Sequence, residues 1–278
     1  MKKWMRTYPV AAGFIGFLIG YVFFRLLPEP NQAMAIVKRA LPALLMLAVM
    51  GVAGGRQVFA WEKGSFARNL ILYKSMLVVA VGIGIFTLIA MAIDTKGVPL
   101  EGWGARVVLL AVEFFFVGLF EETCFRGVLM GGLVAKWGNT RRGLFGALIV
   151  SGLIFGFAHV DRALLGPLTV STVLQICNKT LTAGAMGLLI GAGYLVTKNI
   201  WAVAILHGLN DFILSLGEAL YRVEDTPKAN VYVNTQQELS ATVFLLLFTT
   251  ALHLWPLIAG LKLTARLPLP QKGAWKDA

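Results

Sequence analysis

Residues 107–134 read VVLLAVEFFFVGLFEETCFRGVLMGGLV. This run is longer than the roughly 20 apolar residues with which a helix crosses the hydrocarbon layer of a bilayer, about 30 Å thick. Strands of a membrane barrel would instead alternate in segments of about ten residues. The run therefore predicts a transmembrane helix, and it holds four charged residues inside that helix, which are Glu113, Glu121, Glu122 and Arg126.

Similar apolar runs recur along the whole chain. Of its 278 residues, 58% are hydrophobic and 14% are charged, and its mean hydropathy of +0.75 excludes a soluble enzyme. We expect an all-α, polytopic membrane helix bundle that forms a single membrane domain over residues 1–278. Hydropathy predicts about eight transmembrane helices, at residues 9–27, 40–55, 74–93, 107–134, 143–160, 166–196, 200–220 and 240–262.

The net charge of +11 indicates how the chain is oriented in the membrane. With a cytoplasmic N-terminus, the segments on that side hold more Lys and Arg than the segments on the other side, as the positive-inside rule requires. We therefore predict that both termini are cytoplasmic. The basic residues are spread over tails and short loops instead of forming one stripe, so nucleic acid is not an expected partner.

An acidic motif interrupts the fourth apolar segment. An ionised group near the middle of a bilayer costs about 2.5 to 3.5 kcal/mol, so it needs a partner or a wet cavity and is a functional candidate. Glu122 and Arg126 stand at i and i+4 with the acid first, so they can pair. Glu121 is turned about 100° away on the helix, which leaves its carboxylate free to take protons.

Two of the three histidines of the chain lie in other membrane segments at i, i+4 spacing from a further motif residue. His159 shares a helical face with Phe155, and His207 shares one with Asp211, each at i, i+4 spacing. On neighbouring helices, Glu121, His159 and His207 could surround one water molecule. The carboxylate would take the proton of the water, and an imidazole would position it or stabilise an oxyanion.

Three motifs resemble those of the CAAX-protease and bacteriocin-processing family of glutamic-type intramembrane proteases. They are E-E-x-x-x-R at 121–126, F-x-x-x-H at 155–159 and H-x-x-x-[N/D] at 207–211, in the order of the family. The resemblance covers residues 105–215 and implies a four-helix catalytic core there. It also implies hydrolysis of a peptide bond inside the membrane.

The resemblance implies a role for each motif residue. Glu121 would be the general base that activates water together with His159. His207 and the residue at position 211 would line the oxyanion site, and Glu122 and Arg126 would hold the base in place.

Position 211 departs from the prenyl-protein proteases of the family, which carry Asn there. A carboxylate would repel an oxyanion, so Asp211 must be protonated, orient His207, or yield the amide role to the neighbouring Asn210. We also expect Asn210 and Phe155 to contact the substrate.

The family is often called a metalloprotease family, and two histidines with a glutamate would suit zinc. The H-E-x-x-H motif is absent from this sequence, however, and a glutamate-activated water needs no metal. We therefore expect no cofactor. The alternative is a zinc ion held by Glu121, His159 and His207.

We expect an intramembrane protease, an endopeptidase whose substrate is a membrane-tethered or lipid-modified protein or peptide in the lipid bilayer. The alternative is a non-proteolytic protein that confers bacteriocin self-immunity or serves as a membrane scaffold. A proton-relay transporter is a third hypothesis, although no inverted repeat is visible. The compact chain with short loops resembles bacterial relatives, which predicts a multi-pass protein of the cytoplasmic membrane. No motif indicates the substrate, the cleavage site or the oligomeric state.

Further residues inside the spans also invite a prediction. Glu113 lies two turns before Glu121 and would line the same cavity or face solvent. Asn178 and Lys179 predict a polar rim, and the alternative is that they anchor substrate. Glycines whose small size would let helices approach closely are Gly184, Gly187 and Gly191.

Overall fold

The computed structural model describes residues 2–55, 59–166, 168–221 and 239–270, and the regular elements within them are all helices. Eight helical segments of this part are long and apolar enough to cross a membrane. The predicted all-α fold and the predicted number of spans are confirmed. The chain is a multi-pass membrane protein.

Each predicted span corresponds to one helical segment. The fourth is composite and joins α6 (Trp103–Glu122), the π-helix η2 (Thr123–Met130) and α7 (Gly131–Trp137). The other seven are α2 (Pro9–Leu26), α3 (Gln32–Gly54), α5 (Lys74–Asp94), α8 (Arg141–Ala158), α9 (Val170–Thr197), α10 (Ile200–Tyr221) and α11 (Leu239–Arg266). Shorter elements are α1 (Lys2–Thr7), α4 (Ser65–Leu72) and the 3₁₀ turn η3 (Arg162–Leu165).

Hydropathy predicted that helix α3 begins near residue 40, and that prediction is wrong. Helix α3 begins at Gln32. The side chain of Asn31 caps it by accepting a hydrogen bond from the backbone N of Met34 at 3.0 Å. Lys38 and Arg39 lie inside the helix, where Glu29 pairs with both at 3.2 and 3.1 Å. The two basic residues lowered the hydropathy of a turn that is nevertheless helical.

The fourth segment changes from α to π geometry directly after the acidic motif. All eight residues of η2 are buried. Helices α2 and α3 enclose this segment, with the ring of Phe17 5.1 Å from that of Phe125. Stretches of π-helix are rare and occur frequently at functional sites. Glu121 follows Trp103 by 18 residues and so lies about 27 Å along the composite segment, near its middle.

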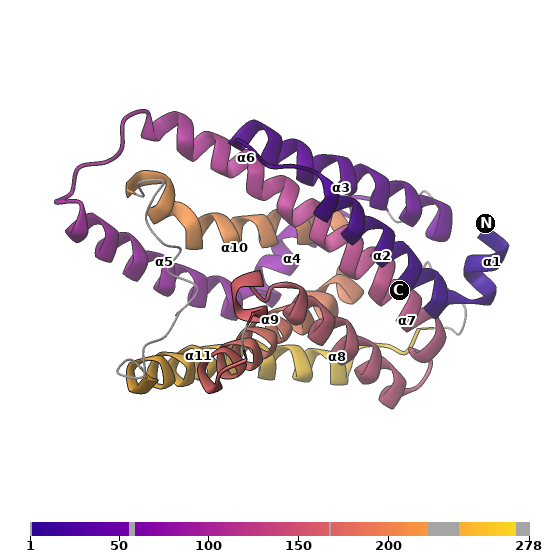
Figure 1. Cartoon of the computed structure of the whole chain (residues 1–278). Helices are drawn as coiled ribbons and strands as arrows, with labels where there is room; N and C mark the ends of the chain where they lie inside the picture. The colour runs from indigo at the N-terminus through magenta and orange to yellow at the C-terminus, as the bar shows by residue number, and fades with distance from the viewer. Residues whose placement is uncertain (1, 56–58, 167, 222–238, 271–278) are drawn as a thin grey trace.

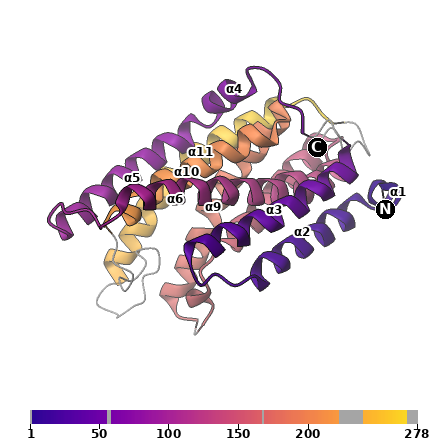
Figure 2. The ribbon, with the colours of Figure 1, turned by 90° about the horizontal axis from the view of Figure 1, so that it is seen from above.

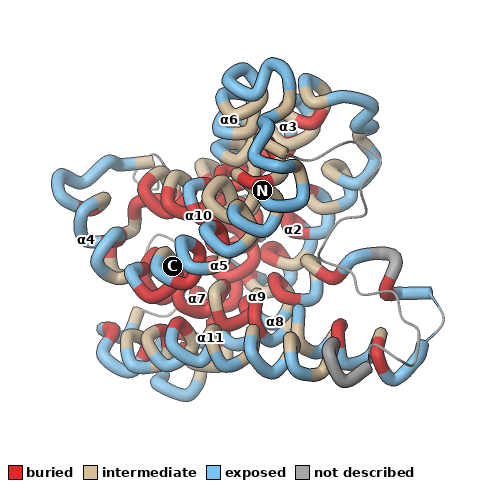
Figure 3. Tube along the Cα trace, turned by 90° about the vertical axis from the view of Figure 1, so that its left-hand side faces the viewer, coloured by how far each residue is buried: buried red, intermediate tan, exposed pale blue. Residues whose placement is uncertain are grey.

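The helices surround α9, the most enclosed of the spans. In its most apolar 18-residue window, 78% of the residues are buried, against 17% for the window of α11. Figure 1 shows α2, α3 and α6 along one side of the bundle and α8, α9 and α11 along the other. Figure 3 shows buried positions gathered inside the bundle and exposed ones along its outer helices. The outer surface is largely apolar, as lipid contact requires.

Glycines bring the helices of the acidic and histidine motifs together. A Cβ atom at Gly118 of α6 would meet the carbonyl of Ala204 on α10 at 2.2 Å. A Cβ at Gly156 of α8 would meet the carbonyl of Thr180 on α9 at 2.0 Å. The predicted role of Gly184, Gly187 and Gly191 in close approach is confirmed. A Cβ on these three would lie 3.1, 3.0 and 2.9 Å from atoms of Gly152, Phe155 and Met130.

Helix α1 and the C-terminal end of α11 lie at the same end of the bundle (Figures 1 and 2). At this end Arg141, the first residue of α8, donates to the carbonyl of Thr264 on α11 at 2.8 Å. The connections from α2 to α3 and from α5 to α6 lie at the opposite end. An even number of spans accounts for this arrangement, and a cytoplasmic location of both termini stays a prediction.

Candidate active site

The base of the site is a buried charge network on the composite helix and α10. The carboxylate of Glu122 contacts Nδ1 of His207 at 2.5 Å through Oε1 and Nε of Arg126 at 3.1 Å through Oε2. The side chains of Glu122 and Arg126 are 0% and 1% exposed. The predicted i, i+4 pair is confirmed. A buried ion pair is tolerated only when its geometry and additional hydrogen bonds are good, and the histidine supplies one here.

An aromatic ring closes the other side of this network. The guanidinium of Arg126 lies 4.2 Å from the centre of the Phe155 ring, and one of its nitrogens donates to the carbonyl of Gly187 at 3.5 Å. The Phe155 ring in turn lies 4.3 Å from the ring of His159 and 5.8 Å from that of His207. Phe155 is 3% exposed, so it packs the charged residues against α8. Its predicted contact with substrate stays a prediction.

Glu121 lies between the two histidines, turned away from Arg126 as predicted. Its Oε2 atom is 3.3 Å from Nε2 of His159 and 3.7 Å from Nε2 of His207. Three residues from α6, α10 and the C-terminal cap of α8 thus face one point. The longer distance exceeds that of a direct hydrogen bond and suits a bridging water.

A hydrogen bond through Nδ1 fixes the orientation of each imidazole ring. Nδ1 of His159 lies 2.8 Å from the carbonyl of Phe155, which can only accept, so this nitrogen carries a proton. Nδ1 of His207 faces the Glu122 carboxylate and must also donate. The Nε2 atoms of both rings are therefore left for chemistry, and both point at Glu121.

Asp211 completes the cluster one turn after His207. Its Oδ2 lies 3.5 Å from Nε2 of His207, and its Oδ1 accepts a hydrogen bond from the side-chain amide of Asn210 at 3.1 Å. One amide proton of Asn210 is thus engaged by Asp211. Asn210 is 6% exposed, and its predicted contact with substrate is not tested by this arrangement.

Exposure divides the site into two sides. The side chains of Glu121, His159 and Asp211 are 18%, 27% and 23% exposed, whereas those of Glu122 and His207 are 0% and 5% exposed. The first three form the accessible side, and the other two, with Arg126, form the support behind it. A rigid support behind accessible groups is expected where the reacting atoms of a substrate must be held close to those groups.

The alternative of a zinc ion held by Glu121, His159 and His207 stays untested. Within the described part of the chain, no group of three or more His, Cys, Asp and Glu side chains is arranged to hold a metal ion. The nitrogens nearest Glu121 both belong to histidines that also bond through Nδ1. The classification as a metalloprotease is not supported.

Some sequence candidates lie elsewhere. Glu113 pairs with Arg39 of α3 at 3.1 Å and lines a separate pocket nearer the start of α6. The prediction of a polar rim is wrong for Asn178, whose amide donates to Leu246 and Thr250 of α11 and so joins two helices. Lys179 is exposed on the outer face of α9.

The carbonyl of Gly187, the π geometry of η2 and the contact of His207 with Glu122 are parts of the site that the sequence did not reveal. A backbone acceptor carries no signature of its own, and Gly187 was expected only to allow close packing. The nearest available signal was its glycine-rich context on α9, because missing side chains leave carbonyls accessible.

The fold and the site define a polytopic membrane protein with a glutamate and two histidines on a buried ionic support. Residues 103–213 match the family model described as Type II CAAX prenyl endopeptidase Rce1-like. This part of the chain is an Rce1-like domain, and the resemblance inferred from the motifs is confirmed. It begins with the first residue of α6 and includes every motif residue from Glu121 to Asp211. The family is one of proteases, which supports a peptidase role in general. No curated protein and no solved structure matches the chain.

Proposed function

We propose that the protein is an intramembrane endopeptidase in which Glu121 and His159 activate a water molecule. One observation carries the proposal: the carboxylate of Glu121 faces Nε2 of both His159 and His207, while Nδ1 of each ring is held by an acceptor. A buried acid with two oriented imidazoles is the equipment of general base catalysis on water. The position of Glu121 near the middle of a 35-residue span supports chemistry inside the membrane.

In the first step, Glu121 takes a proton from water while the water oxygen attacks the carbonyl carbon of the peptide bond. Nε2 of His159, 3.3 Å from the carboxylate, holds the attacking water in line. The new C–O bond forms as the carbonyl π bond opens. A negative charge then resides on the former carbonyl oxygen.

His207 is suited to stabilise that charge. Its Nδ1 proton is directed to Glu122, so a second proton on Nε2 makes the ring a cation with an N–H donor facing the reaction site. A fixed donor in a site of low polarity stabilises an oxyanion strongly. When the intermediate collapses, the C–N bond breaks and the leaving amine takes the proton from Glu121.

Asp211 would keep His207 in its charged form. Its Oδ2 lies 3.5 Å from Nε2 of His207, close enough to favour an imidazolium, and the Asn210 amide holds its other oxygen. Of the three roles considered for a carboxylate at this position, orientation of His207 agrees best with the distances. The chemistry requires no metal, because proton transfer and charge stabilisation are both provided by side chains.

The family description points to an isoprenylated peptide as the first substrate to test. We propose that the substrate is a lipid-modified or membrane-tethered peptide, that the protein resides in the cytoplasmic membrane, and that the site is reached from the bilayer. Residues 105–215 would form the catalytic core, and the other spans would complete a single domain.

The test is cleavage of a farnesylated peptide that ends in a C-a-a-X sequence, with the purified protein in liposomes and products identified by mass spectrometry. Glu121→Gln is expected to lower the rate at least about 100-fold, as loss of a general base does. Glu101→Gln is the matched control, because Glu101 is exposed in the turn before α6. A metal chelator should leave the rate unchanged.

Two results would contradict the proposal. Cleavage by Glu121→Gln at the rate of the unaltered protein would exclude Glu121 as the base. Failure of the unaltered protein to cleave either this peptide or its unprenylated form would favour the non-proteolytic scaffold or immunity role.

A further inference from the structure

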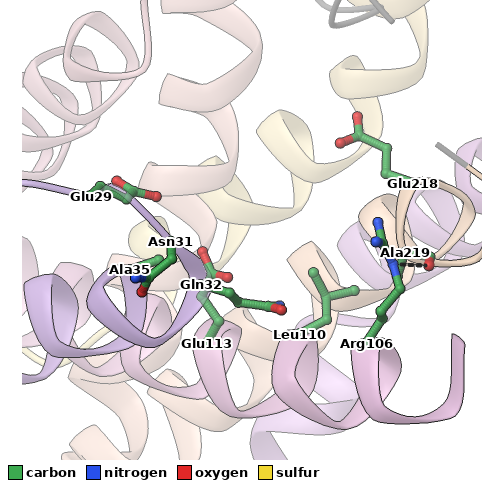
Figure 4. Close-up of a pocket in the computed structure, with 9 residues that line it drawn as sticks. All are labelled: Glu29, Asn31, Gln32, Ala35, Arg106, Leu110, Glu113, Glu218 and Ala219. Carbon is green, nitrogen blue, oxygen red and sulfur yellow. Dashed lines mark hydrogen bonds between the residues drawn. The ribbon is translucent and has the colours of Figure 1, made fainter. Parts of the chain in front are cut away.

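A second polar site lies at the end of the bundle opposite α1. It is a pocket of about 370 Å³ between the α2–α3 connection, α3, α6 and α10 (Figure 4). None of the motif residues line it. Glu113, its deepest acidic residue on α6, lies eight residues from Glu121, or about 12 Å along the helix. Its polar lining residues include Glu29, Gln32, Arg106, Glu113 and Glu218.

The acidic side of the pocket is held by ion pairs. Glu29 pairs with Lys38 and Arg39, and the other terminal nitrogen of Arg39 pairs with Glu113 at 3.1 Å. Burial raises the pKa of Glu29, but the charges and hydrogen bonds of Arg39 and Lys38 outweigh it and leave that pKa below its usual value. The Glu29 carboxylate is therefore charged at neutral pH and fixed in place.

Arg106 supplies the basic group of the pocket. Its Nε donates to the carbonyl of Ala219 at 3.0 Å, in the last turn of α10, where helix carbonyls have no intrahelical partner. That bond holds the guanidinium plane still. Within the described part of the chain, no partner lies at its two terminal nitrogens. A guanidinium fork of this kind matches a phosphate or carboxylate group.

The pocket and its surroundings hold charges of both signs. The carboxylates of Glu29, Glu113 and Glu218 stand against the cations of Lys38, Arg39 and Arg106. A ligand with both charges can therefore find a partner for its anion and for its cation, and a partly buried charge is tolerated when it is paired. A carboxylate has about four lone-pair positions, so an acid that already has a partner can accept a further donor.

The position of the pocket in the bundle points to the membrane surface. Trp103, one turn before Arg106 at the start of α6, is 52% exposed. Tryptophan is enriched at the level of lipid headgroups. Further along α6, Val108, Val112 and Phe115 are exposed and apolar, so hydrocarbon chains can lie against the same helix below the pocket.

We propose that this pocket binds the headgroup of a zwitterionic phospholipid with a primary ammonium group, that is, phosphoethanolamine chemistry. The phosphate binds the terminal nitrogens of Arg106, and the ammonium donates to the carboxylate of Glu218, which lies on the Arg106 side of the pocket (Figure 4). Choline, whose nitrogen has no N–H, cannot make the second set of bonds, and an anionic glycerol headgroup lacks the cation. The proposal is independent of the peptidase function.

The test is native mass spectrometry of the purified protein with phosphatidylethanolamine, phosphatidylcholine and phosphatidylglycerol of equal chain length. We expect at least about tenfold tighter binding of phosphatidylethanolamine, since the other two headgroups lack the hydrogen bonds from an ammonium to a charged acceptor. Arg106→Gln should remove this preference. Lys96→Gln, which removes an exposed cation at the same end of the bundle, should retain it.

Because Arg106 also bonds to Ala219, each variant is first tested for unfolding in detergent without lipid. Glu218→Gln is a second variant that leaves the Arg106 bond intact, and it should weaken binding of phosphatidylethanolamine but not of phosphatidylglycerol. Equal binding of the three lipids by the unaltered protein, or an unchanged preference in folded Arg106→Gln, would overturn the proposal.

Two competition arms identify the source of the ligand. Soluble phosphoethanolamine should displace the lipid only at far higher concentration, because it has no chains to lie against α6. Displacement at equal concentration would assign the pocket to a free metabolite of the same chemistry. Displacement by the farnesylated peptide would assign it to the substrate path and overturn the lipid assignment.

Discussion

Removal of the Arg126 charge tests whether the ionic support behind the site stabilises the fold. In Arg126→Met, an apolar chain of similar length replaces the guanidinium, so the cavity is small. The Glu122 carboxylate is 0% exposed and loses its partner at 3.1 Å, while the Phe155 ring loses a cation 4.2 Å away. Removal of one member of a buried pair costs about 3–5 kcal/mol, and we expect a free energy of unfolding lower by that amount.

A double-mutant cycle separates pairing from packing. Glu122→Gln leaves the arginine charge buried, but the double variant Glu122→Gln/Arg126→Met contains neither charge. The double variant should therefore be about 2 kcal/mol more stable than the sum of the single effects. Unfolding is followed by circular dichroism during titration with sodium dodecyl sulfate in mixed micelles.

Arg141→Met is the matched control for this experiment. Arg141 donates to the carbonyl of Thr264 at the end of the bundle and should contribute only about 1 kcal/mol. Additive single effects in the cycle, within about 0.5 kcal/mol, would refute the inference that Glu122 and Arg126 depend on each other.

Further outcomes follow from the same structure. Asp211→Asn keeps the shape of the side chain but removes the charge that favours the His207 imidazolium, so cleavage of the farnesylated peptide should slow by at least about tenfold, whereas an unchanged rate would show that the carboxylate is not needed. Gly208→Ala should lower the free energy of unfolding by about 1–3 kcal/mol, since the new Cβ would lie 2.4 Å from the carbonyl of Phe114. Gly146→Ala, with no atom within 4 Å of the new Cβ, should not destabilise the protein. Glu29 has a pKa below 4.5 in the folded protein, so its contribution to stability is present above about pH 4.5 and is lost as the pH falls through the folded value. Glu29→Gln should thus lower the thermal midpoint at neutral pH, and this effect should shrink as the pH falls below about 4.5, whereas an effect that does not change with pH would contradict the pairing with Arg39.

The number of spans and the pairing of Glu122 with Arg126 could be predicted because each depends on a pattern within a short stretch of sequence. An apolar run of about 20 residues has one favourable state in a bilayer, and Glu122 and Arg126 at i, i+4 have one obvious contact. The start of α3 was missed because Lys38 and Arg39 reduce local hydropathy. Their partners, Glu29 and Glu113, come from other parts of the chain, and no local pattern reveals such a pairing.

The π geometry of η2 could not be predicted for a different reason. Residues 123–130 have an ordinary composition for a membrane helix, and the i, i+4 spacing of Glu122 and Arg126 suits an α-helix equally well. The change of helix type depends on what surrounds the segment. The contact of His207 with Glu122 was likewise hidden, because the motif of each helix indicated only its own i, i+4 partner.

The enclosure of η2 by α2 and α3 determines whether the Rce1-like domain can be moved into another protein without these two helices. The ring of Phe17 rests on Phe125, and Met50 occupies the space that a side chain at position 127 would need. Both neighbours precede residue 103, where the Rce1-like domain begins. A gene fragment limited to that domain would expose the helix that carries Glu121 and Glu122 on its inner face. The first two spans thus support the proposed active site, and chimaeras should exchange them together with the Rce1-like domain.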